Sequence, residues 1–98
     1  AAMLENIVYF ELRRRGYEVY IGKNGTKEID FVAVRRDERM YVQVCRTLPE
    51  ESDREIANLL AIKDHYPKYV VTLDEWATGN INGVKMVHLA DFLQSDQY

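Results

Sequence analysis

Apolar residues near the start of the chain recur at the spacing of an amphipathic helix. The stripe consists of Leu4, Ile7, Val8 and Leu12. Residues three and four positions apart share one face of a helix, so the stripe predicts a helix over residues 3–15. Arginines in its last turn suit the helix dipole, and Gly16 is suited to end it. We therefore expect the first element to be a helix that buries one face.

Short runs rich in β-branched and aromatic residues follow and predict strands over residues 17–21, 28–35 and 40–46. The last two strands would form a hairpin across a charged turn at residues 36–39. The runs IDFVAV and MYVQVC are almost continuously apolar rather than alternating. Strands of this kind are usually buried on both faces, so we expect helices to cover both sides of the sheet.

The second half of the chain predicts a helix over residues 51–65 and a buried strand over residues 68–74. Because a helix precedes it, this strand is expected to lie parallel to a neighbour. A turn, a short strand over residues 84–88 and a helix that begins at residues 90–93 complete the order αβββαββα. The expected fold is one α/β domain spanning residues 1–98, with a mixed central sheet of four to five strands flanked by helices.

Size and composition limit what such a domain does. Ninety-eight residues suffice for one compact domain and not for two. The net charge of −3 does not favour binding a polyanion through the field of the whole molecule, so a nucleic-acid surface would have to be a local basic patch. A single cysteine excludes an internal disulfide and fits a reducing cytoplasm. No run approaches the ~18 to 20 apolar residues of a membrane span, so no membrane partner is expected.

Three polar residues on the expected hairpin form the candidate site. Asp30 interrupts the apolar run of the first strand, and Gln43 and Cys45 lie two positions apart on the second. Residues i and i+2 of a strand point to the same face, so Gln43 and Cys45 are neighbours, and a matching register would set Asp30 beside them. An acid facing a polar pair on the next strand is the layout of a metal-dependent nuclease site.

The helix, antiparallel meander, helix and strand, taken with these residues, resemble the PD-(D/E)XK or restriction-endonuclease-like fold over nearly the whole chain. The resemblance implies that Glu5 matches the acid of the first helix and Asp30 the acid of the second strand. It also implies that Gln43 stands where the family has an acid and Cys45 where it has a lysine. The catalytic positions would then be vestigial.

More narrowly, the segments ENIVYFELRRRGYEVYIGK, EIDFVAV and YVQVC are similar to the C-terminal domain, of unassigned function, of bacterial and archaeal AAA-type ATPases. This resemblance implies an ATPase module in the same full-length chain. No GxxxxGKS/T motif occurs here, so the chain itself is not expected to bind ATP. Ala1 and Ala2 precede Met3 like a cloning remnant, which suggests a domain cut from a longer protein.

The departures from the family pattern predict a loss of catalysis. Phosphodiester hydrolysis uses a divalent cation, usually Mg²⁺, held by carboxylates and other hard oxygen ligands. Gln43 offers one neutral oxygen, and Cys45 is a soft ligand that cannot replace a lysine ammonium. We therefore expect a degenerate, non-catalytic nuclease-fold module, without a required cofactor, that mediates nucleic-acid or protein interaction in the cytoplasm.

The alternative is an active Mg²⁺-dependent DNA or RNA nuclease with a rearranged site. Asp30 and Glu5 would then hold the metal ion. Lys27 or Lys23, in the turn before Asp30, would stand in for the missing lysine.

The same residues also have purely structural interpretations. Glu5 suits the dipole of a first helical turn. Asp30 could bond to a backbone amide or to Lys27, because an acid inside an apolar run needs a partner. Gln43 could be a satisfied buried amide, and Cys45 a small buried apolar residue.

Basic residues of the first half of the chain are candidates for a nucleic-acid surface. The candidates are Lys23, Arg35, Arg36 and Arg46. The guanidinium fork suits phosphate oxygens, so these side chains would contact DNA if the domain binds it, and ordinary solvation is the alternative. An apolar sheet edge or the region of Trp76 is a candidate surface for a homo-oligomer.

Overall fold

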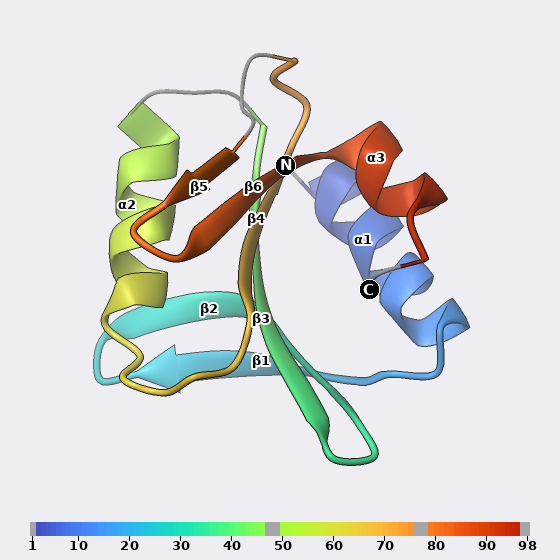
Figure 1. Cartoon of the computed structure of the whole chain (residues 1–98), viewed down its shortest axis with the longest axis horizontal. Coiled ribbons are helices and arrows are strands. Elements are labelled where there is room, and N and C mark those ends of the chain that lie inside the picture. The colour runs from blue at the N-terminus through green and yellow to red at the C-terminus, as the bar shows by residue number, and fades with distance from the viewer. Residues whose placement is uncertain (1, 47–49, 76–78, 97–98) are drawn as a thin grey trace.

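The computed structural model describes residues 2–46, 50–75 and 79–96, and arranges them in three layers (Figure 1). In chain order the elements are α1 (Ala2–Arg14), β1 (Glu18–Asn24), β2 (Lys27–Arg35), β3 (Glu38–Cys45), α2 (Glu50–Leu60), β4 (Lys68–Thr72), β5 (Gly79–Ile81), β6 (Val84–His88) and α3 (Leu89–Gln94). Figure 1 shows α2 on one face of the sheet, and α1 and α3 on the other. None of the described helices has the length and apolar character needed to cross a membrane.

The described residues form a mixed sheet with the strand order β1-β2-β3-β4-β6-β5. β1, β2 and β3 make an antiparallel meander, whereas β4 lies parallel to both β3 and β6. Parallel neighbours cannot be joined by a tight turn, so α2 serves as the crossover between β3 and β4. The prediction of a mixed α/β fold with a parallel strand after the second helix is confirmed.

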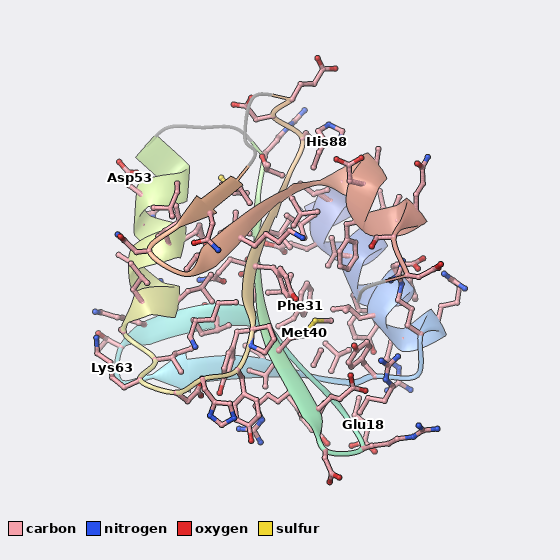
Figure 2. The ribbon with its side chains drawn as sticks, in the orientation of Figure 1. Glu18, Phe31, Met40, Asp53, Lys63 and His88 are labelled. Atoms are coloured by element: carbon pink, nitrogen blue, oxygen red, sulfur yellow. The ribbon has the colours of Figure 1, made fainter. Side chains whose placement is uncertain are left out.

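Each face of the sheet carries its own apolar cluster. The α1-side cluster consists of Leu4, Val8, Leu12, Tyr17, Ala33, Met40, Val42, Val44, Val71, Val87 and Phe92. The α2-side cluster consists of Ile29, Tyr41, Cys45, Ile56, Leu59, Val70, Val84 and Met86. Alternate residues of β3 enter opposite clusters, which explains why the run MYVQVC is apolar almost throughout. Figure 2 shows Phe31 and Met40 on the side of the sheet that faces α1.

The sheet contains six strands rather than the four to five expected, because β5 and β6 form a hairpin that the sequence analysis missed. Pairing ends at Ile81–Val84, and Asn82 and Gly83 make the two-residue turn. Both residues have a positive φ, 53° and 97°, as the two-residue Asn-Gly turn requires. The predicted order αβββαββα is therefore one strand short, and the order of the described elements is αβββαβββα.

The second helix is shorter than predicted, since it ends at Leu60 and not at residue 65. Asp64 makes local bonds that compete with a helix: its Oδ1 accepts a hydrogen bond from the Tyr66 N–H at 3.0 Å. Lys68 Nζ donates to the same Oδ1 at 2.9 Å and to the Asp64 carbonyl at 3.1 Å. These bonds turn the chain from α2 back to the start of β4.

Candidate functional site

Asp30 lies in a β-bulge of β2. β1 and β2 pair at Tyr20–Val32 and again at Gly22–Ile29, so one residue of β1 faces two residues of β2. Ile29 and Val32 both pack on the α2 side, which a regular strand does not allow for residues three positions apart. The extra residue interrupts the alternation of side chains at Asp30.

β2 and β3 have the register that sets Asp30 beside Gln43. Their ladder runs toward the bulge and stops at the pair Phe31–Val42, and the residues that follow this pair on the two strands are Asp30 and Gln43. The predicted neighbourhood of these two residues is therefore present in the fold.

Side chains replace the backbone ladder at this point. The Asp30 N–H donates to Gln43 Oε1 at 2.7 Å, and Gln43 Nε2 donates to the Glu28 carbonyl at 3.2 Å. In the opposite direction, the Val44 N–H donates to Asp30 Oδ2 at 2.8 Å. Each side chain bonds to the backbone of the other strand, and we call this arrangement the Asp30–Gln43 clasp. It satisfies backbone groups that would lack partners where the ladder stops.

The electrostatics of Asp30 place its carboxyl near the first helix. Burial raises the pKa of the Asp30 carboxyl, and the hydrogen bond from the Val44 N–H works against that rise. The charge of Glu5 on α1 raises the pKa of Asp30 further, because two nearby carboxylates repel each other. The charge of Glu5 therefore acts on the Asp30 carboxyl.

Gln43 and Cys45 lie inside the protein, where they do not complete a magnesium site. Both side chains are fully buried, and Cys45 belongs to the α2-side cluster. The Gln43 amide is used within the clasp, and a thiol is a soft ligand. Among the described residues, no group of three or more His, Cys, Asp and Glu side chains is arranged to hold a metal ion. These residues do not fit Mg²⁺, which prefers hard oxygen ligands and keeps several of its waters.

The basic residues predicted to contact nucleic acid are spread over the hairpin instead of forming one patch. Arg36 lies exposed in the turn between β2 and β3. Arg46 follows the far end of β3, an eight-residue strand that rises about 3.3 Å per residue. Lys23 is on β1, and Lys27 is exposed at the start of β2. Trp76, the candidate dimer contact, lies outside the described residues.

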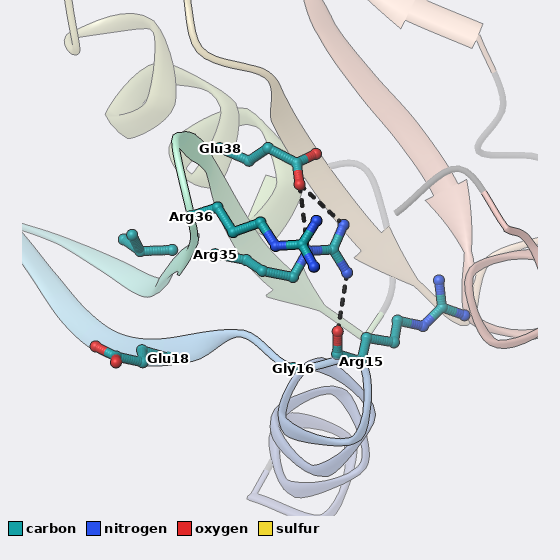
Figure 3. Close-up of a pocket in the computed structure, with 7 residues that line it drawn as sticks. Arg15, Gly16, Glu18, Arg35, Arg36 and Glu38 are labelled. Atoms are coloured by element: carbon teal, nitrogen blue, oxygen red, sulfur yellow. Dashed lines mark hydrogen bonds and ion pairs between the residues drawn. The ribbon is translucent and has the colours of Figure 1, made fainter.

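Arg35 takes part in a structural joint (Figure 3). Its Nη1 donates to the Arg15 carbonyl at 2.8 Å, and its Nε and Nη2 both donate to Glu38 Oε1 at 3.2 Å. The guanidinium carbon also lies 4.2 Å from the centre of the Tyr17 ring. Arg35 therefore holds the end of α1 to the hairpin. A nucleic-acid phosphate would have to compete with these contacts for the guanidinium group.

The hollow beside this joint carries charges of both signs. It measures about 740 Å³ and is lined by three arginines, Arg15, Arg35 and Arg36, and by two glutamates, Glu18 and Glu38. Arg15 forms an ion pair with Glu11 at 2.6 Å, and its Nη2 donates hydrogen bonds to two carbonyls of α3. The two carboxylates repel an anion, so this hollow is a weaker anion site than one lined by cations alone.

A second hollow, on the α2 side, brings a predicted nucleic-acid contact, Lys23, together with two cations that the sequence analysis did not assign to a site. Lys23 lines it together with Arg39 and Lys63. Arg39 is the second residue of β3 and Lys63 follows α2, so nothing in their spacing along the chain links them. Their positive charge was the available signal, and only the fold brings them together.

No family model matches the chain. An "Uncharacterized protein" of Haemophilus influenzae (strain ATCC 51907 / DSM 11121 / KW20 / Rd) is 46% identical to it over 93 residues. The match covers 95% of this chain and 23% of that protein, so the chain spans about a quarter of the length of this relative. The relative therefore has a similar segment within a much longer polypeptide.

We expect the unfolding free energy of Asp30→Asn, measured relative to that of the wild type, to increase as pH rises. A carboxyl whose pKa is raised in the folded state above its ordinary value of 3.8 binds its proton more tightly when folded. The wild type therefore loses stability as pH rises from the ordinary pKa through the raised one, and the asparagine variant lacks that loss. Urea denaturation of both proteins at several pH values from about 3 to 7 measures the difference. A difference that is constant with pH would contradict the raised pKa of Asp30.

Proposed function

We propose that the chain is a non-catalytic nucleic-acid-binding module with a restriction-endonuclease-like fold, attached to an AAA-type ATPase of the cytoplasm. The proposal draws on the antiparallel meander followed by a helix and a parallel strand, and on the pairing of Asp30 with Gln43. The much greater length of the Haemophilus relative is compatible with a further module in the same polypeptide.

The observation that carries the proposal is the Asp30–Gln43 clasp. One carboxylate oxygen of Asp30 and both polar atoms of the Gln43 amide are bonded to backbone groups. A water molecule or a phosphate oxygen would have to displace those bonds in order to reach a metal ion there. A nuclease fold without an accessible metal site would bind nucleic acid without cleaving it.

The test separates cleavage from binding. Purified protein is incubated with supercoiled and single-stranded DNA in Mg²⁺ or Mn²⁺, and its affinity for labelled DNA is measured over a range of salt concentrations. We expect no cleavage, together with binding that weakens steeply as salt rises, because phosphate contacts release counterions.

The alternative, an active nuclease with a rearranged site, rests on the proximity of Glu5 and Asp30. Cleavage that is lost in Asp30→Ala but kept in a matched surface variant, Asp53→Ala, would establish it and overturn the proposal. Absence of both cleavage and DNA binding would instead indicate a protein partner.

A further inference from the structure

Three cationic side chains from separate elements meet at the α2-side hollow. Lys23 comes from β1, Arg39 from β3, and Lys63 from the segment between α2 and β4. No aspartate or glutamate is among the described residues that line the hollow. Within the described part of the chain, the side chains of Lys23 and Lys63 form no hydrogen bond or ion pair. In a protein of net charge −3, such a local concentration of positive charge favours an anion.

The floor of the same hollow is apolar. Ile29, Val32 and Ile62 line it, and its volume is about 500 Å³. Gly22 also lines it, where a Cβ atom would lie 2.7 Å from Val32 Cγ2 and 3.0 Å from Ile29 Cβ. β1 therefore lies against β2 at a distance that leaves no room for a side chain at residue 22.

A hydrogen-bonded network and an aromatic ring lie beside Arg39, one of the three cations. The Tyr41 hydroxyl donates to Asp64 Oδ2 at 2.6 Å, and Lys68 Nζ donates to Asp64 Oδ1 at 2.9 Å. Arg39 lies within electrostatic range of Tyr41, and its guanidinium carbon lies 5.6 Å from the centre of the Tyr66 ring. A cation positioned before a ligand arrives loses less conformational freedom on binding.

From this arrangement we propose that the α2-side hollow binds a nucleotide unit of a single-stranded nucleic acid. The base would lie on the apolar floor, and Lys23, Arg39 and Lys63 would contact the adjoining phosphates. A duplex keeps its bases stacked inside, whereas a single strand can present a base face and a phosphate together. The inference rests on the proposed function and deepens it by naming the ligand and its site.

The experiment uses a labelled thymidine oligonucleotide and fluorescence anisotropy at several salt concentrations. The double variant Lys23→Gln with Lys63→Gln is expected to bind at least about tenfold more weakly at low salt. The salt dependence should also weaken, by about 0.7 in the slope of log affinity against log salt for each phosphate that the protein no longer neutralises. The matched control, Arg13→Gln with Arg54→Gln, removes the same charge from exposed positions that do not line the hollow, and should bind like the wild type apart from a small loss of general attraction.

Two further ligands test whether the base contacts the apolar floor and whether the hollow prefers a strand to a free nucleotide. An oligonucleotide with the same phosphates but without bases should bind about 5-fold more weakly or worse, because it has no base to stack. Free thymidine monophosphate should compete only at far higher concentration than the oligonucleotide. Competition by the mononucleotide at equal concentration would overturn the assignment to a strand, and equal binding of the abasic strand would overturn the role of the floor.

The outcomes distinguish this inference from the proposed function. If the wild type binds single strands but the lysine double variant binds as well as the arginine control, the hollow is not the site while nucleic-acid binding stands. If the wild type binds no nucleic acid, both proposals fail. All four substituted residues are exposed, so thermal unfolding of the variants should match that of the wild type.

Discussion

Replacing Gln43 by alanine is expected to lower the free energy of unfolding by about 2 to 4 kcal/mol. The side chain is fully buried, and its amide holds the Asp30 N–H and the Glu28 carbonyl of β2. Without the amide, a backbone N–H next to the bulge loses its partner, and the deleted atoms leave a cavity in a buried part of the sheet. Urea denaturation followed by circular dichroism measures the change.

Asn58→Ala is the matched control for this prediction. Asn58 Nδ2 donates to the same Glu28 carbonyl at 3.3 Å, but the side chain is only partly buried and makes no bond to Asp30. We expect a loss of about 1 kcal/mol or less, as for one partly solvated hydrogen bond. If Gln43→Ala were as stable as Asn58→Ala, the clasp would not stabilise the fold beyond the β2–β3 ladder.

Replacing Phe92 by alanine is expected to cost about 3 to 5 kcal/mol of unfolding free energy. Phe92 is the fully buried residue of the short helix α3 and lies in the α1-side cluster, against which Leu89 of the same helix also packs. Arg15 lies over its ring at 5.4 Å and donates to its carbonyl at 2.9 Å. Removing the ring therefore leaves a large cavity and loosens the contact between α3 and the end of α1.

Leu93→Ala, on the same helix, supplies the comparison. Leu93 is 36% exposed, so its truncation should change stability by about 1 kcal/mol or less. Thermal and urea unfolding of the two variants measure the contrast. A small effect of Phe92→Ala would mean that α3 is not docked on the sheet through this residue.

The order of helices and strands could be predicted largely from the sequence, because local patterns encode it. The stripe through Leu4, Val8 and Leu12 predicts α1, and the continuous apolar runs predict the strands that helices cover on both faces. The hairpin β5–β6 also had a local signal, the dipeptide Asn82-Gly83, which is typical of a two-residue turn. Its strands are short, and β5 has no buried residue to give it an apolar pattern.

The end of α2 was harder to predict because it depends on contacts made after folding. Residues 61–65 continue an acceptable helical pattern in the sequence. The Asp64 carboxylate, however, accepts hydrogen bonds from Tyr41, Tyr66 and Lys68, which compete with continuation of the helix. Tyr41 comes from a different element, β3. A residue that gains three partners in the fold can end a helix that local propensity would extend.

The candidate site shows the same division. The presence of Asp30, Gln43 and Cys45 on neighbouring strands followed from the spacing of residues, since the register of a hairpin and the period of a strand are local properties. Whether these side chains face an open pocket did not follow from the spacing. One extra residue in β2 interrupts the alternation at Asp30, and the side chains then bond to backbone groups where the ladder stops.

The sequence by itself determined the α/β class, the amphipathic helices, the meander and the meeting of Asp30 with Gln43. The tertiary structure alone decided that Gln43 is sealed within the clasp, that Arg35 joins the hairpin to α1, and that Lys63 lies with Lys23 and Arg39 at one hollow. The physical reason is that patterns along the chain specify which residues face inward. Burial, competing hydrogen bonds and the grouping of distant charges arise only when separate elements pack together.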